Sequence, residues 1–319
     1  SLIMIRNPST VLNEVYCKPP IHTGKGGPRG RPHGVLTAHQ NGFKYIVGNS
    51  SGGAVGATFV DIIYSNIKSC FLLRADKQDT LILFHFELHN PIYIKNDKTT
   101  KYIQFYVELQ EEVRDVGSKA NEYENDYLEE QEEQRQRQRR KLHNKRFAAF
   151  ASSVEQQWRN NNPEVTFEFE LPESKQKFPG VVGRDIVDVY PSDNHIVALQ
   201  STSPFVVNVN ELECVALERV GFGLREFDLC FIFKGFKQDV RMIHSIPMTK
   251  LDQLRMFFAN HNVIALETRL NLNWKLVLED IKNNLESFYQ DGGWSVYFED
   301  EEEEDGELSS GDESAFEPS

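Results

Sequence analysis

Two successive series of short β-prone segments, each followed by a helical segment, limit what this chain can fold into. The first series occupies residues 35–109 and holds about seven stretches of strand length separated by turn residues. Within it, Asn41-Gly42 lies between two β-prone runs and predicts a hairpin, because both residues tolerate positive φ. The second series starts at TFEFEL, residues 166–171, and ends before Thr249. The pattern predicts an α+β chain, mainly β with helices, built from two similar units.

A helical segment follows each series. Residues 118–160 contain no Pro or Gly, and a second apolar periodic segment begins at Thr249, which is placed to cap it. The expected buried positions are Phe147, Phe150, Val154 and Trp158 in the first helix and Leu251, Leu254, Phe257 and Phe258 in the second. We predict two small barrels, each closed by its C-terminal helix, which is the arrangement of tandem pleckstrin-homology-like domains.

An amphipathic helix is expected after the second unit. It begins near Trp274, and Gly292-Gly293 forms its expected end. Its apolar face comprises Trp274, Val277, Leu278, Ile281, Leu285 and Phe288. A stripe of this kind either packs on its own domain or forms part of a groove for a partner protein.

The last segment of the sequence is a block of negative charge. Eleven of the 48 acidic residues lie between Glu299 and Ser319, and this segment contains no Lys or Arg. Without it, 37 acidic and 35 basic residues remain, so the net charge changes from −13 to −2. Such a segment cannot bury enough apolar surface to fold and is predicted to be disordered.

These patterns divide the chain into five segments. The first ends in a Gly- and Pro-rich stretch and is expected to be a flexible linker. The expected boundaries are 1–33 for the linker, 34–160 for the first unit with its long helix, 161–261 for the second unit, 262–298 for a helical-turn extension and 299–319 for the acidic tail.

The sequence offers no set of residues for catalysis, a metal or a cofactor. His85 and His89 flank Glu87, but in a strand two residues four positions apart lie ~13 Å from each other, which is too far to share one zinc ion. The Gly-rich stretch 48–56 lacks the Lys-Ser/Thr of a phosphate-binding loop. We therefore predict that the chain is not an enzyme.

Membrane and secretory signals are absent from the sequence. No apolar run approaches the ~20 residues of a membrane helix, and no signal-peptide pattern is present. The chain is therefore expected to be soluble and intracellular. Its four cysteines are widely spaced and are expected to be free thiols in the core or at the surface: Cys17, Cys70, Cys214 and Cys230.

Two further functions stay open from the residues alone. The basic run at 135–146 is either a solvated helix face or a patch for nuclear import or nucleic acid. A pleckstrin-homology scaffold can also bind lipids or act as a signalling adaptor. Lipid binding requires several cations at the first hairpin, however, and only Lys44 lies beside Asn41-Gly42. Protein contacts are therefore favoured over a membrane, which the acidic tail also opposes.

Several longer stretches resemble a known family. They are residues 38–45, 60–72, 83–92, 203–234, 245–248, 272–281 and 288–304. In this order they are similar to the middle and C-terminal regions of the large subunit of FACT, a histone chaperone. The resemblance implies a tandem pleckstrin-homology-like middle domain, a hydrophobic helical turn and an acidic disordered tail. It also implies that an aminopeptidase-like domain and a dimerisation domain would precede this sequence.

The resemblance implies a histone chaperone in the nucleus, on chromatin, that reorganises nucleosomes during transcription, replication and repair. Expected partners are the histone 2A-2B dimer, histones 3 and 4, the smaller FACT subunit through a region outside this sequence, and nucleosomal DNA indirectly. No cofactor is implied. An acidic tail has the same charge sign as DNA, so it can cover the DNA-binding surface of a histone dimer.

Two groups of residues are the expected histone contacts. In the tail, an aromatic anchor is predicted to enter an apolar pocket of the histone 2A-2B dimer while acids meet the surrounding Lys and Arg. This group comprises Phe316, Asp312, Glu313, Glu317, Glu301, Glu302, Glu303 and Glu304. The helical-turn group comprises Ile264, Leu266, Leu270 and Leu272 as exposed residues, with Trp274 in the supporting helix. Packing on the second unit is the alternative for the helical-turn group.

Overall fold

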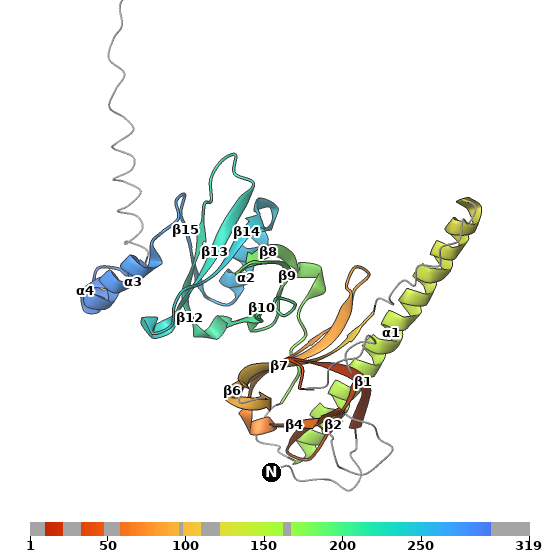
Figure 1. Ribbon diagram of the computed structural model, residues 1–319. Helices are drawn as coiled ribbons and strands as arrows, with labels where there is room; N and C mark the ends of the chain where they lie inside the picture. Colours follow the sequence, from red (N-terminus) through yellow and green to blue (C-terminus); the bar gives the residue numbers. More distant parts are fainter. Residues whose placement is uncertain are drawn as a thin grey trace, which may run out of the picture. The chain divides into compact units, whose positions relative to one another are not determined.

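The computed structural model describes residues 10–21, 33–47, 58–95, 98–109, 122–161 and 167–294. The chain forms two compact units, Ser1–Ser174 and Lys175–Ser319 (Figure 1). Each unit contains a β-sheet and an apolar core of its own. The predicted mixture of two sheets with helices is therefore confirmed.

The first unit contains a seven-stranded sheet with the order β4-β3-β2-β1-β7-β6-β5. The strands are β1 (Thr10–Lys18), β2 (Gly34–Ala38), β3 (Gly42–Val47), β4 (Thr58–Ile63), β5 (Ile67–Leu73), β6 (Leu81–Lys95) and β7 (Lys98–Glu108). The first part of β1 pairs with β2 and its last part pairs with β7, so β1 joins the two halves of the sheet. Since β4 and β5 are the two ends of this order, the sheet is open between them and is not the closed ring expected of a barrel.

β1 corrects the assignment of residues 1–33 to a linker. Thr10–Lys18 form a strand in which Leu12 and Val15 are buried. The period-2 pattern is interrupted at Glu14, which has a φ of 58°. The pairing with β2 shifts register at this point, as it does at a β-bulge. The bulge hides the alternation by which a strand is recognised.

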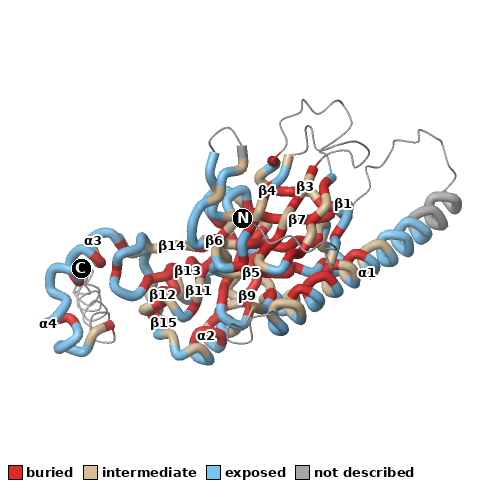
Figure 2. Tube along the Cα trace, turned by 90° about the horizontal axis from the view of Figure 1, so that it is seen from below, coloured by how far each residue is buried: buried red, intermediate tan, exposed pale blue. Residues whose placement is uncertain are grey.

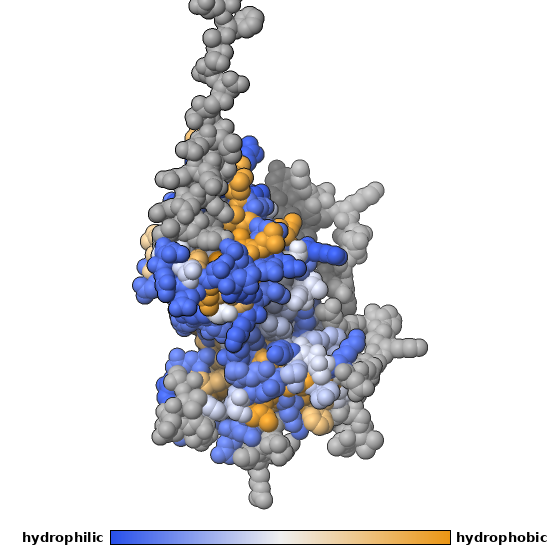
Figure 3. Space-filling view, turned by 90° about the vertical axis from the view of Figure 1, so that its left-hand side faces the viewer, coloured by the Kyte–Doolittle hydropathy of each residue, from blue (hydrophilic) through white to orange (hydrophobic). Residues whose placement is uncertain are grey.

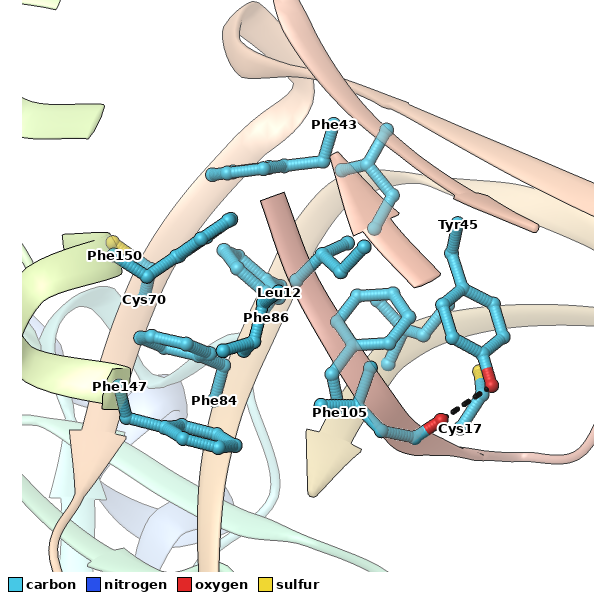
Figure 4. Packing of buried hydrophobic residues seen from close by; sticks show 14 of the residues in the cluster. Leu12, Cys17, Phe43, Tyr45, Cys70, Phe84, Phe86, Phe105, Phe147 and Phe150 are labelled. Carbon is cyan, nitrogen blue, oxygen red and sulfur yellow. Dashed lines mark hydrogen bonds between the residues drawn. The ribbon is translucent and has the colours of Figure 1, made fainter. Parts of the chain in front are cut away.

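The long helix α1 (Glu122–Asn161) covers the core of the first unit with its C-terminal part, as predicted. Phe147 is fully buried, and its ring stacks on Phe84 with 5.0 Å between the ring centroids (Figure 4). Phe150 and Val154 are buried in the same cluster, and Trp158 packs against it half-buried. Figure 2 shows that the rest of the helix is mainly exposed where it is described.

The Asn41-Gly42 hairpin is confirmed, although its turn differs from the expected one. β2 and β3 are antiparallel, and Ala38 is opposite Phe43. Neither Asn41 nor Gly42 has a positive φ. Three residues, 39–41, lie between the two strands, and a hydrogen bond from His39 N to Gly42 O of 2.8 Å closes the connection.

The TFEFEL segment belongs to the first unit, not to the second. Phe169 is buried in the first core, and the half-buried Phe167 packs against it. The backbone of Glu170 joins the edge of β5 through two hydrogen bonds of 2.9 Å, to Leu72 N and Cys70 O. The alternating Phe residues imitate a strand, but this contact is an isolated bridge.

The second unit contains an eight-stranded sheet with the order β11-β10-β9-β8-β14-β13-β12-β15. The strands are β8 (Phe178–Val182), β9 (Asp185–Pro191), β10 (His195–Ala198), β11 (Phe205–Asn208), β12 (Leu212–Glu218), β13 (Glu226–Phe233), β14 (Arg241–Pro247) and β15 (Ile264–Glu267). Since β11 and β15 are the two ends of this order, this sheet too is open. Short 3-10 turns of both units are η1 (Tyr64–Asn66), η2 (Ser174–Gln176), η3 (Val209–Glu211), η4 (Lys234–Phe236) and η5 (Met248–Lys250).

α2 (Leu251–Asn260) buries the predicted face against this sheet: Leu251, Leu254, Phe257 and Phe258. Its start differs from the prediction. Thr249 lies within η5, and the residue at the helix cap is Lys250, without a side-chain capping hydrogen bond. The preceding 3-10 turn supplies backbone hydrogen bonds that a Thr cap would otherwise supply.

Candidate functional site

β12 is buried on both faces, because different parts of the unit cover them. On the inner face, Val215 and Leu217 belong to the core beneath α2. On the outer face, Cys214 and Ala216 belong to a separate cluster with the C-terminal part of the unit. The side chains of β13 likewise alternate between the inner core and the outer cluster. A sheet that is apolar on both faces requires a second covering layer.

The C-terminal extension, residues 264–294, supplies that layer (Figure 1). β15 pairs in parallel with β12, and Leu266 lies opposite Ala216. The helices α3 (Trp274–Asn283) and α4 (Leu285–Gln290) follow. The buried side chains of the extension are Leu266, Trp274, Leu278, Ile281, Phe288 and Trp294. Since one buried side chain of this size contributes ~1.5–3 kcal/mol, these six fix the extension firmly to the sheet.

Two expectations about the extension were wrong. The segment Ile264–Glu267, expected to be an exposed apolar turn, is a strand, because the free edge of β12 offers its backbone a set of hydrogen-bond partners. The single expected helix is interrupted at Asn284, whose φ of −125° is not helical. After this break Leu285 is exposed, although the helical period placed it on the buried face. The predicted end at Gly292-Gly293 is confirmed by their positive φ values.

Glu218 connects the sheet to the loop before α3. It is fully buried at the end of β12. Its Oε1 accepts hydrogen bonds from Leu272 N at 3.0 Å and from Trp274 Nε1 at 2.7 Å, while Oε2 has no hydrogen-bond partner among the residues that the structure describes. A buried polar group that loses its partner costs about 1–3 kcal/mol. The carboxylate therefore fixes the position of both donors, and so the position of the loop.

Glu213, at the other end of β12, makes a second such connection. Its Oε1 accepts hydrogen bonds from Tyr289 Oη at 2.8 Å and from Trp294 Nε1 at 3.4 Å. Burial, and then the neighbouring Glu213 carboxylate, raise the pKa of Tyr289 to about 12, so its hydroxyl keeps the proton that it donates. The extension is thus held by a carboxylate at each end of one strand.

Asp228 lies opposite Glu218 on β13 and organises the hairpin between β12 and β13. Arg219 donates to its two oxygens at 3.0 and 2.8 Å, and Ser245 N donates at 2.9 Å. Burial alone would raise the pKa of Asp228, but these donors and His244 outweigh it and hold the pKa below its ordinary value. The carboxylate is therefore the charged centre of a local network.

The predicted helical-turn residues do not form one exposed surface. Ile264 and Leu270 are exposed, at 48% and 63%, and Leu272 is half-buried. Leu266 and Trp274 are buried, so Leu266 supports the extension and is not available for contact. Leu276 on α3, which the sequence pattern did not indicate as a contact residue, is 60% exposed. The predicted tail residues, from Glu301 to Phe316 and Glu317, lie outside the described residues.

Glu218 was also missed as a site residue. The signal available in the sequence was a single Glu at the end of the apolar run of β12, which is unusual for a buried strand unless the carboxylate has a partner. A Trp with an indole N–H that needs an acceptor follows at Trp274. Nothing in the spacing of these two residues, 56 positions apart, joins them before the fold is known.

Other chemistry is limited in the part of the chain that the structure describes. No group of three or more His, Cys, Asp or Glu residues could hold a metal ion there. No described helix is both long and apolar enough to cross a membrane. The predicted free thiols are confirmed: Cys17, Cys70, Cys214 and Cys230 are buried and unpaired as disulfides, and burial raises the pKa of each.

Two family descriptions match the two units. Residues 10–154 match "FACT complex subunit SPT16 PH-like domain", and residues 180–265 match "Histone chaperone Rttp106-like, middle domain". Both describe domains of a non-enzymatic class, in agreement with the prediction that this chain is not an enzyme. The fold and these matches define the chain as a pair of PH-like domains of the histone chaperone class.

Relatives that align with nearly the whole chain identify its particular family. FACT complex subunit SPT16 of Oryza sativa subsp. japonica is 36% identical over 98% of this chain and 29% of its own length. The Zea mays protein is 37% identical over 93% of this chain and 27% of its own length. The Caenorhabditis elegans protein is 33% identical over 89% of this chain and 26% of its own length. This chain belongs to the FACT complex subunit SPT16 family, as the sequence resemblance predicted. It spans somewhat more than a quarter of the length of these relatives.

A solved structure, "Structure of the Spt16D Pob3N heterodimer", overlaps 73% of this chain and 94% of its own chain. The sequence identity is 9% and the TM-score is 0.24, which is too low to show a shared fold.

Proposed function

We propose that this chain is a histone-binding module of a FACT chaperone. It binds histone 2A-2B dimers, and also histones 3 and 4, to reorganise nucleosomes during transcription, replication and repair in the nucleus. The observation that carries the proposal is the match of residues 180–265 to a histone chaperone domain, within a chain 36% identical to a FACT subunit. The smaller FACT subunit would join through a region outside this sequence, and nucleosomal DNA would be contacted indirectly.

The two units serve as scaffolds in this proposal. Each is a PH-like unit in which a helix covers the core of an open sheet, α1 in the first unit and α2 in the second. The scaffold presents the C-terminal extension on a rigid sheet, because Glu218 and Glu213 fix the extension at both ends of β12. Surfaces on rigid elements lose little conformational entropy when they bind.

Charge provides the long-range part of the proposed binding. Histones are strongly basic, and eleven acidic residues lie between Glu299 and Ser319 without a Lys or Arg. Such a segment attracts a basic partner and speeds association, but it specifies little. Phe316 would add a specific apolar contact, which is worth ~1.5–3 kcal/mol when the ring is buried.

The contact surface of the extension is redefined by the structure. Ile264 and Leu270 are the exposed members of the helical-turn group, and Leu276 adds a third exposed apolar side chain. Leu266 and Trp274 support this surface from within. We expect the exposed three to contact apolar patches of the histones while the tail covers the basic surface.

Calorimetry with purified histone 2A-2B dimers tests the tail. Micromolar binding corresponds to ~8 kcal/mol, so loss of one buried ring should weaken binding about ten-fold or more. We expect Phe316→Ala to do this, whereas a shuffled tail that keeps the charge and moves the Phe should behave like Phe316→Ala. If both variants bind like the native chain, charge alone accounts for the tail. Absence of binding to dimers and to histones 3 and 4 would refute the proposed function.

A second measurement tests the extension. The double substitution Ile264→Ser, Leu270→Ser should weaken histone binding, and the matched control Ile186→Ser, on the exposed face of β9, should not. Hydrogen exchange with histones should slow at residues 264–276. Unchanged exchange there would leave the tail as the binding element. Binding to anionic liposomes instead of histones would favour a lipid-binding PH domain.

A further inference from the structure

The turn between β12 and β13 presents a phenylalanine to solvent. Leu224 N donates to Gly221 O at 3.3 Å, and Gly223 has a φ of 82°. A positive φ at the third residue and a hydrogen bond between the first and fourth are features of a type II turn. Phe222 is the second residue of this turn, and it is fully exposed. Its ring contributes nothing to either core of the second unit.

Two leucines extend this apolar surface. Leu224 is 48% exposed in the same turn, and Leu270 is exposed in the loop after β15. The two segments lie side by side, because Val220 N donates to Thr268 O at 2.9 Å and the Thr268 hydroxyl donates to Leu270 O at 2.8 Å. We call Phe222, Leu224 and Leu270 the tip patch. Figure 3 shows apolar surface gathered on the second unit among hydrophilic residues. An apolar group of this kind with a polar rim is typical of a binding site.

The rim of the tip patch carries unpaired positive charge. Arg225 follows Leu224 and Arg269 precedes Leu270, and both side chains are exposed. Neither forms an ion pair with another described residue. Arg219 and Arg255 are already paired with carboxylates, and Glu226 is the exposed acid nearest in sequence to Arg225. An aromatic centre with two free guanidinium groups fits an acidic peptide with an apolar anchor.

We propose that the tip patch binds the segment GDESAFEPS, residues 311–319 of the same chain. Phe316 would pack against the tip patch, and the flanking acids would meet Arg225 and Arg269. These acids are Asp312, Glu313 and Glu317. The charge signs are complementary, and the segment carries one large apolar side chain for one apolar patch.

The chain length suits this contact. Trp294 lies beside Glu213 at the start of β12, and Phe222 is nine residues further along β12 and its turn. At ~3.3 Å per residue, that path spans at most about 30 Å. Phe316 is 22 positions after Trp294. A flexible uncharged chain of this length has a root-mean-square span of about 26 Å, and the like charges of this segment lengthen it. A linker whose span matches the distance gives the highest effective concentration, in the millimolar range. A contact with a Kd of about 1 mM would then be formed roughly half of the time.

The consequence is a regulatory one. In the bound form Phe316 is covered, so a histone would have to displace it from the tip patch before meeting the same ring. This consequence rests on the proposed function, but the contact itself does not, because it is measured without histones.

Paramagnetic relaxation in the full chain tests the contact. The four native thiols are buried, so Ser319→Cys provides one accessible site for a nitroxide label. We expect selective broadening of the backbone amides of residues 219–225 and 268–270. Phe222→Ser and Phe316→Ala should each abolish most of it, and the matched exposed control Ile186→Ser should not. Phe222 is fully exposed, so its substitution leaves the fold intact. The free peptide GDESAFEPS, added at several millimolar, should also remove the broadening.

Three results would overturn the proposal. One is broadening spread evenly over the second unit, or absent from it. Another is broadening that survives Phe222→Ser, which would place the contact elsewhere. A third is broadening seen only between chains, in a mixture of nitroxide-labelled chains and separately isotope-labelled chains. The tip patch would then serve a second copy of the chain.

Discussion

Replacing Glu218 should loosen the C-terminal extension, because its carboxylate accepts two hydrogen bonds from the loop before α3. Glu218→Ala removes the acceptor of Leu272 N and Trp274 Nε1 and leaves both donors without a partner in a buried site. Glu218→Gln keeps an acceptor oxygen of the same shape but removes the charge. The two variants therefore separate the hydrogen bonds from the charge.

The structure sets the expected magnitudes. Each buried donor left unpaired costs about 1–3 kcal/mol. Removing the carboxylate also removes the desolvation penalty of a buried charge whose Oε2 has no partner among the described residues. This gain offsets part of the destabilisation. We expect Glu218→Ala to destabilise the second unit by about 2–4 kcal/mol and Glu218→Gln by about 1 kcal/mol or less. The control Glu213→Ala, whose carboxylate is half-buried with one short and one long hydrogen bond, should cost about 1 kcal/mol.

Urea unfolding monitored by tryptophan fluorescence measures these differences. Trp274 and Trp294 report on the extension, and Trp158 on the first unit. Hydrogen exchange at Leu272 N should accelerate in Glu218→Ala, since its acceptor is lost. Equal stability of Glu218→Ala and the native chain would refute the reasoning. It would mean that the cost of burying an incompletely paired carboxylate cancels the two hydrogen bonds.

Three further perturbations have defined outcomes. Burial, followed by Lys18, lowers the pKa of His85 to about 3. The pKa of His85 in the unfolded chain is about 6.5, so the first unit should lose about 2 kcal/mol of stability between pH 7 and pH 5. His85→Leu should remove this pH dependence from the free energy of unfolding, measured by denaturation at several pH values. Phe147→Ala should cost about 3–5 kcal/mol in thermal unfolding, whereas the exposed Leu142→Ala on the same helix should change stability by less than about 0.5 kcal/mol. Asp228→Asn should cost about 2–3 kcal/mol at neutral pH, and this difference should shrink as the pH falls from the ordinary pKa of an Asp toward the lowered pKa of folded Asp228, where the carboxylate takes up its proton.

Local patterns predicted the helices and most strands, because their burial follows the side-chain period. Phe147, Phe150 and Val154 recur with the period of a helix and are buried on one face. The same holds for Leu254 and Phe258 in α2. Such helices can be predicted from the local spacing of apolar residues, without knowledge of the segments against which they pack.

The errors arose where a distant partner decides the structure. β1 contains a bulge at Glu14 that breaks its alternation. Residues 264–267 become a strand because β12 offers them a free edge, which local propensity cannot show. Glu170 joins β5 of the first unit through its backbone. The contact of Glu218 with Trp274 crosses 56 residues and is visible only when the sheet and the extension are assembled.

The double burial of β12 links the proposed binding surface to the stability of the whole second unit. Ile264 and Leu266 are opposite Cys214 and Ala216 of the same strand, whose inner face belongs to the main core. A ligand that binds only the folded extension stabilises every element that must be intact for the extension to fold. Histone binding at Ile264 or Leu270 would therefore slow exchange throughout β12 and β13, not just in the contacted loop. Binding through the tail alone would not require the folded extension, so exchange in these strands would stay as it is in the free chain. The spread of protection along β12 thus distinguishes the two modes of binding.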